Sequence, residues 1–194
     1  PATQTETQLT LESALDLLDE DNETLLVQIT RINGDIVTGG DAATGTIEDD
    51  DTTEVTITDA PTITEAGTLI FNVALSLEAD RAIPVSMDVS YSEYLTTSDF
   101  QVYPGADEEL IVPMGSQLAN LLIGTVDDNL SEGTEVLTLQ VAEVDGVTIS
   151  SGDTATGDIL DNDPVVASIA DAGLVPEGTN MVFTVSLDHE VDRN

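Results

Sequence analysis

The sequence contains no cysteine, no lysine and no tryptophan, and each absence removes a class of protein or site. Without cysteine there is neither a disulfide framework nor a thiolate for metal binding or redox chemistry. No apolar run approaches the roughly 20 residues of a membrane-spanning helix, and the first residues do not read as a signal peptide. The chain does not begin with methionine, so we expect a processed protein or a segment of a longer one.

Positive charge is almost missing as well. Three arginines stand against 39 acidic residues, which gives a formal net charge of −36. A field of this sign repels nucleic acids and anionic membranes, attracts cations and destabilises the compact chain unless cations or salt reduce it. The predicted partners therefore exclude nucleic acid, and no membrane insertion is expected in this segment.

The residues that are present favour strands. Hydrophobic residues make up 40% of the chain, enough for a core, and only 3% of residues are aromatic. Threonine and β-branched residues are frequent, and short segments end in Gly, Asp or Asn, which is typical of strands and turns.

An internal repeat organises the chain. The phrases "TDAPTITEAGTLIFNVALSLEADR" and "ADAGLVPEGTNMVFTVSLDHEVDR" have their first aspartates at Asp59 and Asp171, 112 residues apart. The same ungapped shift superimposes "AATGTIEDDD" on "TATGDILDND". A period of this kind indicates a tandem array. The predicted domains are residues 1–51, the C-terminal part of one repeat; 52–163, a complete repeat; and 164–194, the N-terminal part of the next.

The complete repeat predicts an all-β fold. Apolar and polar residues alternate in "LIFNVALSL", "PVSMDVSY" and "EVLTLQVAEV". The expected strands are 54–58, 67–77, 84–91, 108–112, 117–126, 134–143 and 154–160, which together indicate an immunoglobulin-like, seven-strand antiparallel β-sandwich. Residues 11–26 would suit an amphipathic helix, but their counterpart 123–138 contains Gly124, Asn129 and Gly133, so we expect strand–turn–strand in both.

Acidic residues gather where strands end, and the loops of a sandwich meet at its two ends. Clustered carboxylates without nearby His or Cys favour Ca²⁺ over Zn²⁺ or Cu²⁺, because Ca²⁺ takes six to eight oxygen ligands. Mg²⁺ is the second candidate ion. The alternative is a solvated acidic surface of a salt-adapted protein. Glu23 and Glu135 lie just beyond the main clusters, and we interpret them as charges at a strand edge.

Four segments resemble the signature segments of Calx-beta domains: "VDDNLSEGTE", "GDILDNDP", "PEGTNMVFTVSL" and "SDF". The resemblance covers 52–163 and both partial repeats. That family has a seven-strand sandwich, occurs in regulatory regions of sodium–calcium exchangers and recurs in tandem in large microbial surface proteins. In its calcium-binding members, the ions lie at the end of the sandwich next to the following domain.

The resemblance implies a Ca²⁺ ligand set in each repeat. In the complete repeat the matching positions are Glu65, Glu93, Asp127, Asp128, the Leu130 carbonyl, Glu132, Asp161, Asn162 and Asp163. In the preceding repeat they are Asp16, the Leu18 carbonyl, Glu20, Asp49, Asp50 and Asp51. The sequence departs from the family pattern where Asn162 replaces a carboxylate and where Leu15 stands at the place of Asp127.

Enzymatic chemistry has little support in the sequence. The only histidine, His189, has Leu77 as its repeat counterpart and is expected to face solvent. No nucleophile elbow, phosphate-binding glycine loop or EF-hand loop occurs, and the carboxylate pairs lack the Trp platform of a sugar cleft. Arg81 and Arg193 recur as single cations among acids, which predicts a structural ion pair. The protein is predicted not to be an enzyme.

Three functions remain open at this stage. The first is a calcium-binding structural repeat segment of a large secreted or cell-surface protein, an adhesin-like stalk in which Ca²⁺ stiffens the junctions between neighbouring repeats. The second is a calcium-sensing regulatory module. The third is a subunit of a head-to-tail filament, in which identical subunits complete each other by strand complementation.

Overall fold

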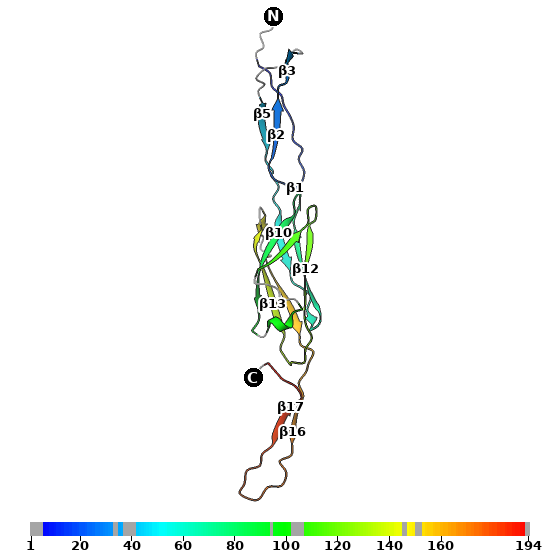
Figure 1. Cartoon of the computed structure of the whole chain (residues 1–194), viewed down its shortest axis with the longest axis vertical. Coiled ribbons are helices and arrows are strands. Elements are labelled where there is room, and N and C mark those ends of the chain that lie inside the picture. The colour runs from blue at the N-terminus through cyan, green and yellow to red at the C-terminus, as the bar shows by residue number, and fades with distance from the viewer. Residues whose placement is uncertain are drawn as a thin grey trace.

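The computed structural model describes residues 6–32, 35–36, 42–93, 95–101, 107–144, 147–149 and 153–192. These residues form a slender rod with a β-sandwich in the middle, one β-hairpin at the N-terminal end and another at the C-terminal end (Figure 1). The described residues contain no α-helix, and the one 3₁₀ turn is η1 (Thr97–Asp99). Within those ranges, no helix combines the length and the apolar character that crossing a membrane would need.

The central sandwich consists of two sheets. The five-stranded sheet has the order β11-β10-β13-β15-β7, and the four-stranded sheet has the order β12-β8-β6-β14. Most neighbours are antiparallel, but β15–β7 and β14–β6 are short parallel pairs. The strands are β6 (Glu54–Thr58), β7 (Ile63–Thr64), β8 (Thr68–Leu75), β10 (Ile83–Tyr91), β11 (Asp107–Val112), β12 (Leu118–Gly124), β13 (Glu135–Val144), β14 (Thr148–Ile149) and β15 (Thr154–Leu160).

The prediction of an all-β, immunoglobulin-like sandwich is confirmed. The seven expected strands correspond to β6, β8, β10, β11, β12, β13 and β15, with ends that differ by at most two residues. The agreement follows from alternation, since successive side chains of a strand point to opposite faces and one face of each sheet is buried.

The core lies between the two sheets. Leu69, Phe71 and Val73 of β8 are fully buried and face Leu137 and Leu139 of β13 in the same apolar cluster. Gly157 of β15 makes room for this packing. A Cβ at that position would lie 2.8 Å from Leu69 Cδ2 and 2.9 Å from Phe71 Cζ.

The N-terminal part contains β1 (Leu18–Asp19), β2 (Glu23–Gln28), β3 (Arg31–Ile32), β4 (Asp35–Ile36) and β5 (Ala42–Ile47), and β2 pairs with β5. The C-terminal part contains β16 (Ala167–Ala170) and β17 (Thr184–Leu187), which pair with each other. Both pairings have counterparts in the central sandwich exactly one repeat away in numbering: Glu23↔Ile47 matches Glu135↔Ile159, and Ala167↔Leu187 matches Val55↔Leu75.

Residues 11–26 differ in part from the expected strand–turn–strand. No helix forms there, and β1 and β2 account for part of the stretch, but residues 11–16 belong to no strand. Their counterparts end β12, which is held by β8. No described residue next to 6–16 takes the place of β8, so this stretch lacks a partner for its backbone.

Truncation of Phe71 tests the core. We expect Phe71→Ala to lower the free energy of unfolding by about 3–5 kcal/mol, because a fully buried ring leaves a cavity. Ile70→Ala, one residue away on the exposed face, is the matched control and should change stability by less than about 1 kcal/mol. Urea unfolding monitored by circular dichroism measures both, and equal losses would contradict the assigned strand phase.

Candidate metal centre

Three segments meet at the C-terminal end of the central sandwich. The parallel pairing of β15 with β7 aligns Leu160 with Thr64, so residues 161–163 emerge beside the turn at Glu65. The Glu65 amide donates to the Leu160 carbonyl at 3.2 Å. The loop after β12 joins them, since the Thr125 amide donates to the Gly67 carbonyl at 2.9 Å. We call the carboxylates gathered here the second acidic cluster: Glu65, Asp127, Asp128, Glu132, Asp161 and Asp163.

The centre of the second acidic cluster is a group of three carboxylates. Oxygens of Glu65, Asp161 and Asp163 all lie within 4.8 Å of one another. Glu65 is only 8% exposed, and burial raises its pKa despite a hydrogen bond from the Asp128 amide. Asp163 Oδ2 is buried and has no hydrogen-bond partner among the described residues. Like charges at this spacing repel by several kcal/mol at a protein surface, so the group suits a bound cation.

Asp161 organises the backbone around this group. Its Oδ1 accepts from the Asp163 amide at 2.7 Å, and its Oδ2 accepts from the Glu132 amide at 2.9 Å. In the neighbouring loop, Asp128 Oδ1 accepts from the Leu130 amide at 2.7 Å. These bonds fix the loops that carry the other acidic side chains.

Asn162 makes a hydrogen bond to a neighbouring residue of the expected ligand set. Its Nδ2 donates to Asp127 Oδ1 at 2.8 Å, so its amide orients a neighbouring carboxylate. Glu93 is exposed in the turn after β10, and among the described residues its carboxylate is not part of the group around Glu65.

Glu135 differs from its interpretation as a charge at a strand edge. It is 2% exposed, and its Oε1 is buried without a hydrogen-bond partner among the described residues. Burial, followed by repulsion from Glu132, Asp99, Glu65 and Asp192, raises the pKa of Glu135 to about 8. Its side chain therefore lies within the field of the second acidic cluster.

The charges of Glu132 and Asp99 also act on Glu135. Burial is the largest cause that raises the pKa of Glu132 to about 7, and Asp99 is the first charged neighbour to add to it. Asp99 and Glu135 were not in the expected ligand set. The signal for Glu135 was its phase in β13, because alternation puts it on the same face as the buried Leu137 and Leu139.

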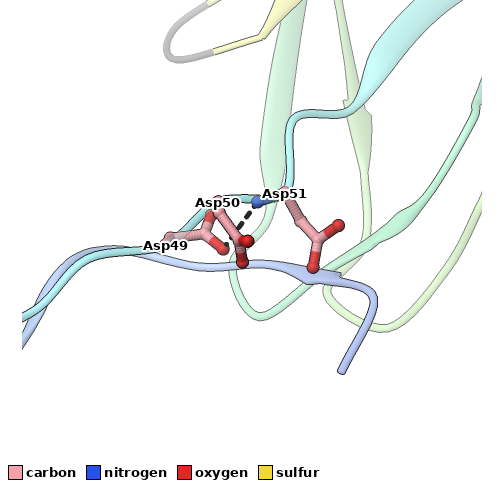
Figure 2. A group of neighbouring side chains, drawn as sticks. All are labelled: Asp49, Asp50 and Asp51. Carbon is pink, nitrogen blue, oxygen red and sulfur yellow. Dashed lines mark hydrogen bonds between the residues drawn. The ribbon is translucent and has the colours of Figure 1, made fainter. Parts of the chain in front are cut away.

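The first acidic cluster lies between the N-terminal part and the sandwich and consists of Asp16, Glu20, Asp49, Asp50 and Asp51. Figure 2 shows Asp49, Asp50 and Asp51 side by side, and their carboxylate oxygens lie within 4.8 Å of one another. Burial, and then repulsion from neighbouring acids, raises the pKa values of Glu20 and Asp51.

The two acidic clusters share one set of backbone contacts. Asp49 accepts from the amides of Glu20 and Asp51, as Asp161 does from Glu132 and Asp163. Asp16 accepts from the Leu18 amide at 3.1 Å, as Asp128 does from Leu130. The clusters differ at two places: Leu15, at the position of Asp127, is exposed, and no described residue stands beside the first cluster where Glu65 stands in the second.

An ion pair accompanies the first acidic cluster. Asp19 is buried, its Oδ1 lies 2.7 Å from Arg81 Nη1, and its Oδ2 accepts from the Thr53 amide at 2.8 Å. The structure thus contains the ion pair predicted for Arg81, whereas Arg193 lies outside the described residues. The contact is reinforced by parallel pairing of β1 with β9 (Glu78–Ala79) and by the Asp80 amide, which donates to the Asp19 carbonyl.

Beside the second acidic cluster, one repeat further along, the corresponding backbone hydrogen bonds are present. Ser131 bridges to Val191, and the Asp192 amide donates to the Ser131 carbonyl at 3.3 Å. His189, which was expected to face solvent, is half-buried there: its Nδ1 lies 3.0 Å from Asp188 Oδ1, and its Nε2 lies 3.3 Å from the Asp163 carbonyl.

Comparison with known proteins gives structural likeness only. No family model matches the chain, and no curated protein matches it. The apo form of the Calx CBD1 domain is 20% identical, with a TM-score of 0.49 over 58% of this chain and 100% of that domain. CBD12 from CALX1.2 is 20% identical, with a TM-score of 0.48 over 57% of this chain and 46% of that one.

A third similar structure is described as the calcium binding domain CBD12 of CALX1.1. It is 22% identical, with a TM-score of 0.46 over 55% of this chain and 44% of its own. The chain thus spans less than half the length of the CBD12 structures. All three of these structures are described as domains of Calx or CALX.

Glu132 and Glu135 predict how metal-free stability depends on pH. The pKa of each carboxyl group is higher in the folded chain than its ordinary value of 4.5. The protonated groups therefore contribute fully to the free energy of unfolding below about pH 4.5, and this contribution is lost as the pH rises to about 8. We expect Glu135→Gln to match the wild type at pH 5 and to exceed its free energy of unfolding at pH 8. Urea titrations without metal, with Asp88→Asn as an exposed control, measure this. A variant less stable at pH 8 would contradict it.

Arg81 predicts a local effect at the first cluster. Arg81→Ala leaves a buried carboxylate with one backbone donor, and we expect a loss of about 1–3 kcal/mol. Hydrogen exchange at the amides of Thr53 and Asp80, which bond to Asp19, should become faster. Arg31→Ala, at an exposed arginine, is the control. Unchanged exchange in Arg81→Ala would show that the ion pair does not hold this contact.

Proposed function

We propose that the chain is a structural calcium-binding repeat segment, in which the second acidic cluster binds Ca²⁺ at the junction between the central sandwich and the part that follows it. The observation that carries the proposal is the buried Glu65 carboxylate held against Asp161 and Asp163. No arginine or lysine among the described residues neutralises this group.

The donor set fits a hard cation. Every side chain of the second acidic cluster offers oxygen, and Ca²⁺ prefers six to eight oxygens in a flexible arrangement. The unpartnered Asp163 Oδ2 and Glu135 Oε1 are two buried acceptors that such an ion would satisfy. The residues that would hold it are Glu65, Asp127, Asp128, Glu132, Glu135, Asp161 and Asp163, with Asp99 nearby.

The ion would neutralise the carboxylates, and the segment that carries them would then be held more rigidly. Asp161 and Asp163 lie on the segment that leads from β15 to β16, and Ser131 and His189 already connect the two parts. Once the carboxylates no longer repel, this segment is held against the turn at Glu65. The part after residue 163 then keeps one orientation relative to the sandwich.

The role of the chain in a larger protein is inferred from the repeat. The proposal includes the division into the partial repeat 1–51, the complete repeat 52–163 and the partial repeat 164–194. Several such junctions in series would make a stiff stalk of a secreted or cell-surface protein. Extracellular modules bind calcium in the range of about 10⁻⁴–10⁻³ M, so external calcium would keep the junctions loaded. In this proposal the chain binds and connects and does not catalyse a reaction.

A calcium-sensing regulatory module is the second candidate. The observation in its favour is the sparse direct contact at the second junction, where Ser131 and His189 make the described bonds to the opposite part. Orientation there would depend strongly on the ion. Affinity separates the two functions, because a sensor needs binding near 10⁻⁷–10⁻⁵ M.

Calcium titration tests the proposal. At about 100 times the dissociation constant, the ion should add about 2.7 kcal/mol, a rise in melting temperature on the order of 10 °C, reversed by EGTA. Glu65→Gln and Asp161→Asn should lose most of this rise. Asp88→Asn removes one exposed charge elsewhere and should retain it. A wild-type melting temperature indifferent to calcium would contradict the proposal.

A further inference from the structure

The four-stranded sheet of the central sandwich ends in a strand without charge. Residues 110–126 form the longest stretch of the sequence without an acidic or basic residue, and β12 lies within it. On the outer face of the sheet, Leu118 is 53% exposed and Leu122 is 61% exposed. Ile70, the partner of Leu122 in β8, is exposed as well. These three side chains form an apolar, uncharged strip on a chain whose net charge is −36.

The edge formed by β12 differs from the other edges of the sandwich. The other outermost strands of the two sheets are β7, β11 and β14. β7 and β14 have two residues each, and β11 begins with Asp107, Glu108 and Glu109. Short strands and charges are features that keep a sheet edge from pairing with another chain. β12 has seven residues, and it contains no charge, no proline and no register shift against β8.

The backbone of β12 presents hydrogen-bonding groups at this edge. The Thr125 amide donates to the Gly67 carbonyl at 2.9 Å, on the side of β8. Because the direction of the backbone groups alternates along a strand, odd-numbered residues of β12 bond to β8 and even-numbered residues face the open edge. Among the described residues, Asn120 and Leu122 have no hydrogen-bond partner at that edge.

Both ends of this edge are partly covered. At the far end of β12, the Gln101 amide donates to the Gly124 carbonyl at 2.9 Å. At its start, the Ser116 hydroxyl donates to the Leu118 carbonyl at 3.0 Å and accepts from the Leu118 amide at 3.4 Å. A partner strand therefore has its best access around Asn120, and it would replace the Ser116 hydroxyl at Leu118.

The outward side chains of β12 read the same in both directions: Leu118, Asn120 and Leu122. In a second, antiparallel copy of the strand with Asn120 facing its own counterpart, Leu118 of one copy lies opposite Leu122 of the other. Residues whose backbone groups face each other in this way exchange hydrogen bonds. On the inner face, the same register places Leu121 opposite the smaller Ala119 of the other copy. The strand is thus complementary to itself.

We propose that β12 is the interaction surface for a second copy of this chain, and that the two copies pair antiparallel about Asn120. The pairing joins the two four-stranded sheets into one continuous sheet. The apolar strips of the two copies then meet on its outer face. Because the contact is isologous, it closes as a dimer. β12 runs roughly along the rod, so the two rods lie side by side and point in opposite directions (Figure 1).

Charge favours a second copy over a basic partner. A basic protein would be attracted to the acidic clusters, and no charge on β12 would direct it to the uncharged strip. A partner as acidic as this chain is repelled by most of the surface, so the strip is the place where it can approach.

The fold itself does not require the apolar strip. In the preceding repeat, the three positions that match the outward residues of β12 are Glu6, Gln8 and Thr10. All three are polar, although the same repeat keeps Leu9 and Leu11 at the positions of the inward Leu121 and Ile123. The apolar outer face of β12 is therefore a feature of the complete repeat and needs an explanation other than core packing.

The pairing involves no residue of either acidic cluster and is independent of the proposed calcium site. The remaining repulsion between copies, including that from the acids of β11, opposes it. We therefore expect association to be reversible, to depend on concentration and to increase with ionic strength, which screens the repulsion. Both tests below are made in EGTA at high salt, so that a failure of calcium binding does not affect them.

A single engineered cysteine tests the register in a chain that has none of its own. Asn120→Cys places the two thiols on facing residues whose Cα atoms are about 5.5 Å apart, within the range of a disulfide. We expect a disulfide-linked dimer that disappears on reduction. Asn72→Cys is the control, because Asn72 pairs with Asn120 one strand further from the edge. Its two copies would lie about 14 Å apart and should give no such dimer. Equal dimer formation by both variants, or none by either, overturns the proposal.

A charge on the edge provides a test without cysteines. Leu122→Glu should leave each copy folded, since the side chain is exposed, and should raise the dissociation constant of the dimer by about tenfold or more. Gln140→Glu adds the same charge on the exposed face of β13 and should associate like the wild type. Sedimentation velocity over a range of concentrations measures all three, and circular dichroism verifies that the variants are folded.

Two results would overturn the proposal. One is a Leu122→Glu variant that associates as well as the wild type. The other is a wild type that stays monomeric at every concentration, which would leave the edge of β12 to a strand of a different protein.

Discussion

Repulsion between carboxylates at the ends of strands is the interaction on which the rest of this molecule depends. Burial of apolar side chains such as Phe71 and Leu139 stabilises the sandwich. Its loops bring the carboxylates of Glu65, Asp161 and Asp163 together, and their repulsion opposes this stabilisation. Burial makes the cost larger, because it withholds water from the charges, and the raised pKa of Glu65 records this. This arrangement places the strongest repulsion between described side chains at the end of the sandwich, beside the segment that leads to β16.

The same constraint explains why the two ends of the sandwich differ. At the first cluster, Arg81 neutralises the buried Asp19, and backbone pairing of β1 with β9 adds to the contact. At the second, Ser131 replaces Asp19, and the carboxylates have no such partner among the described residues. The buried carboxylate of one junction is therefore neutralised by the protein itself, whereas among the described residues no cation neutralises the carboxylates of the other.

Alternation and the repeat made most of the central fold predictable from sequence. Each major strand contains a run such as Leu69, Phe71 and Val73, whose period of two leaves little choice of face. The packing environment was harder to predict. Glu135 is buried while Glu23, at the same place in the repeat, is exposed, because only Glu135 has a second sheet packed over its strand. A local pattern gives the face of a residue, but what covers that face depends on distant segments.

The candidate site was predictable to the extent that its residues follow strand ends. The grouping of Asp161 and Asp163 with Glu65 depends on the parallel pairing of β15 with β7, a contact of two residue pairs that no alternation pattern indicates. Asn162, which the resemblance places among the ligands, donates its amide to Asp127, and its role as a ligand stays a prediction. The ligand set as a whole stays a prediction, and Asp99 and Glu135 lie close enough to the same cluster for their charges to act on it.

The pairing of β1 with β9 has a mechanical consequence. It connects residues 18–19 to residues 78–79 across the same boundary that the covalent chain crosses at residues 48–53. The two crossings, together with the Asp19–Arg81 bond, oppose bending and twisting at this boundary more than a single covalent strand would.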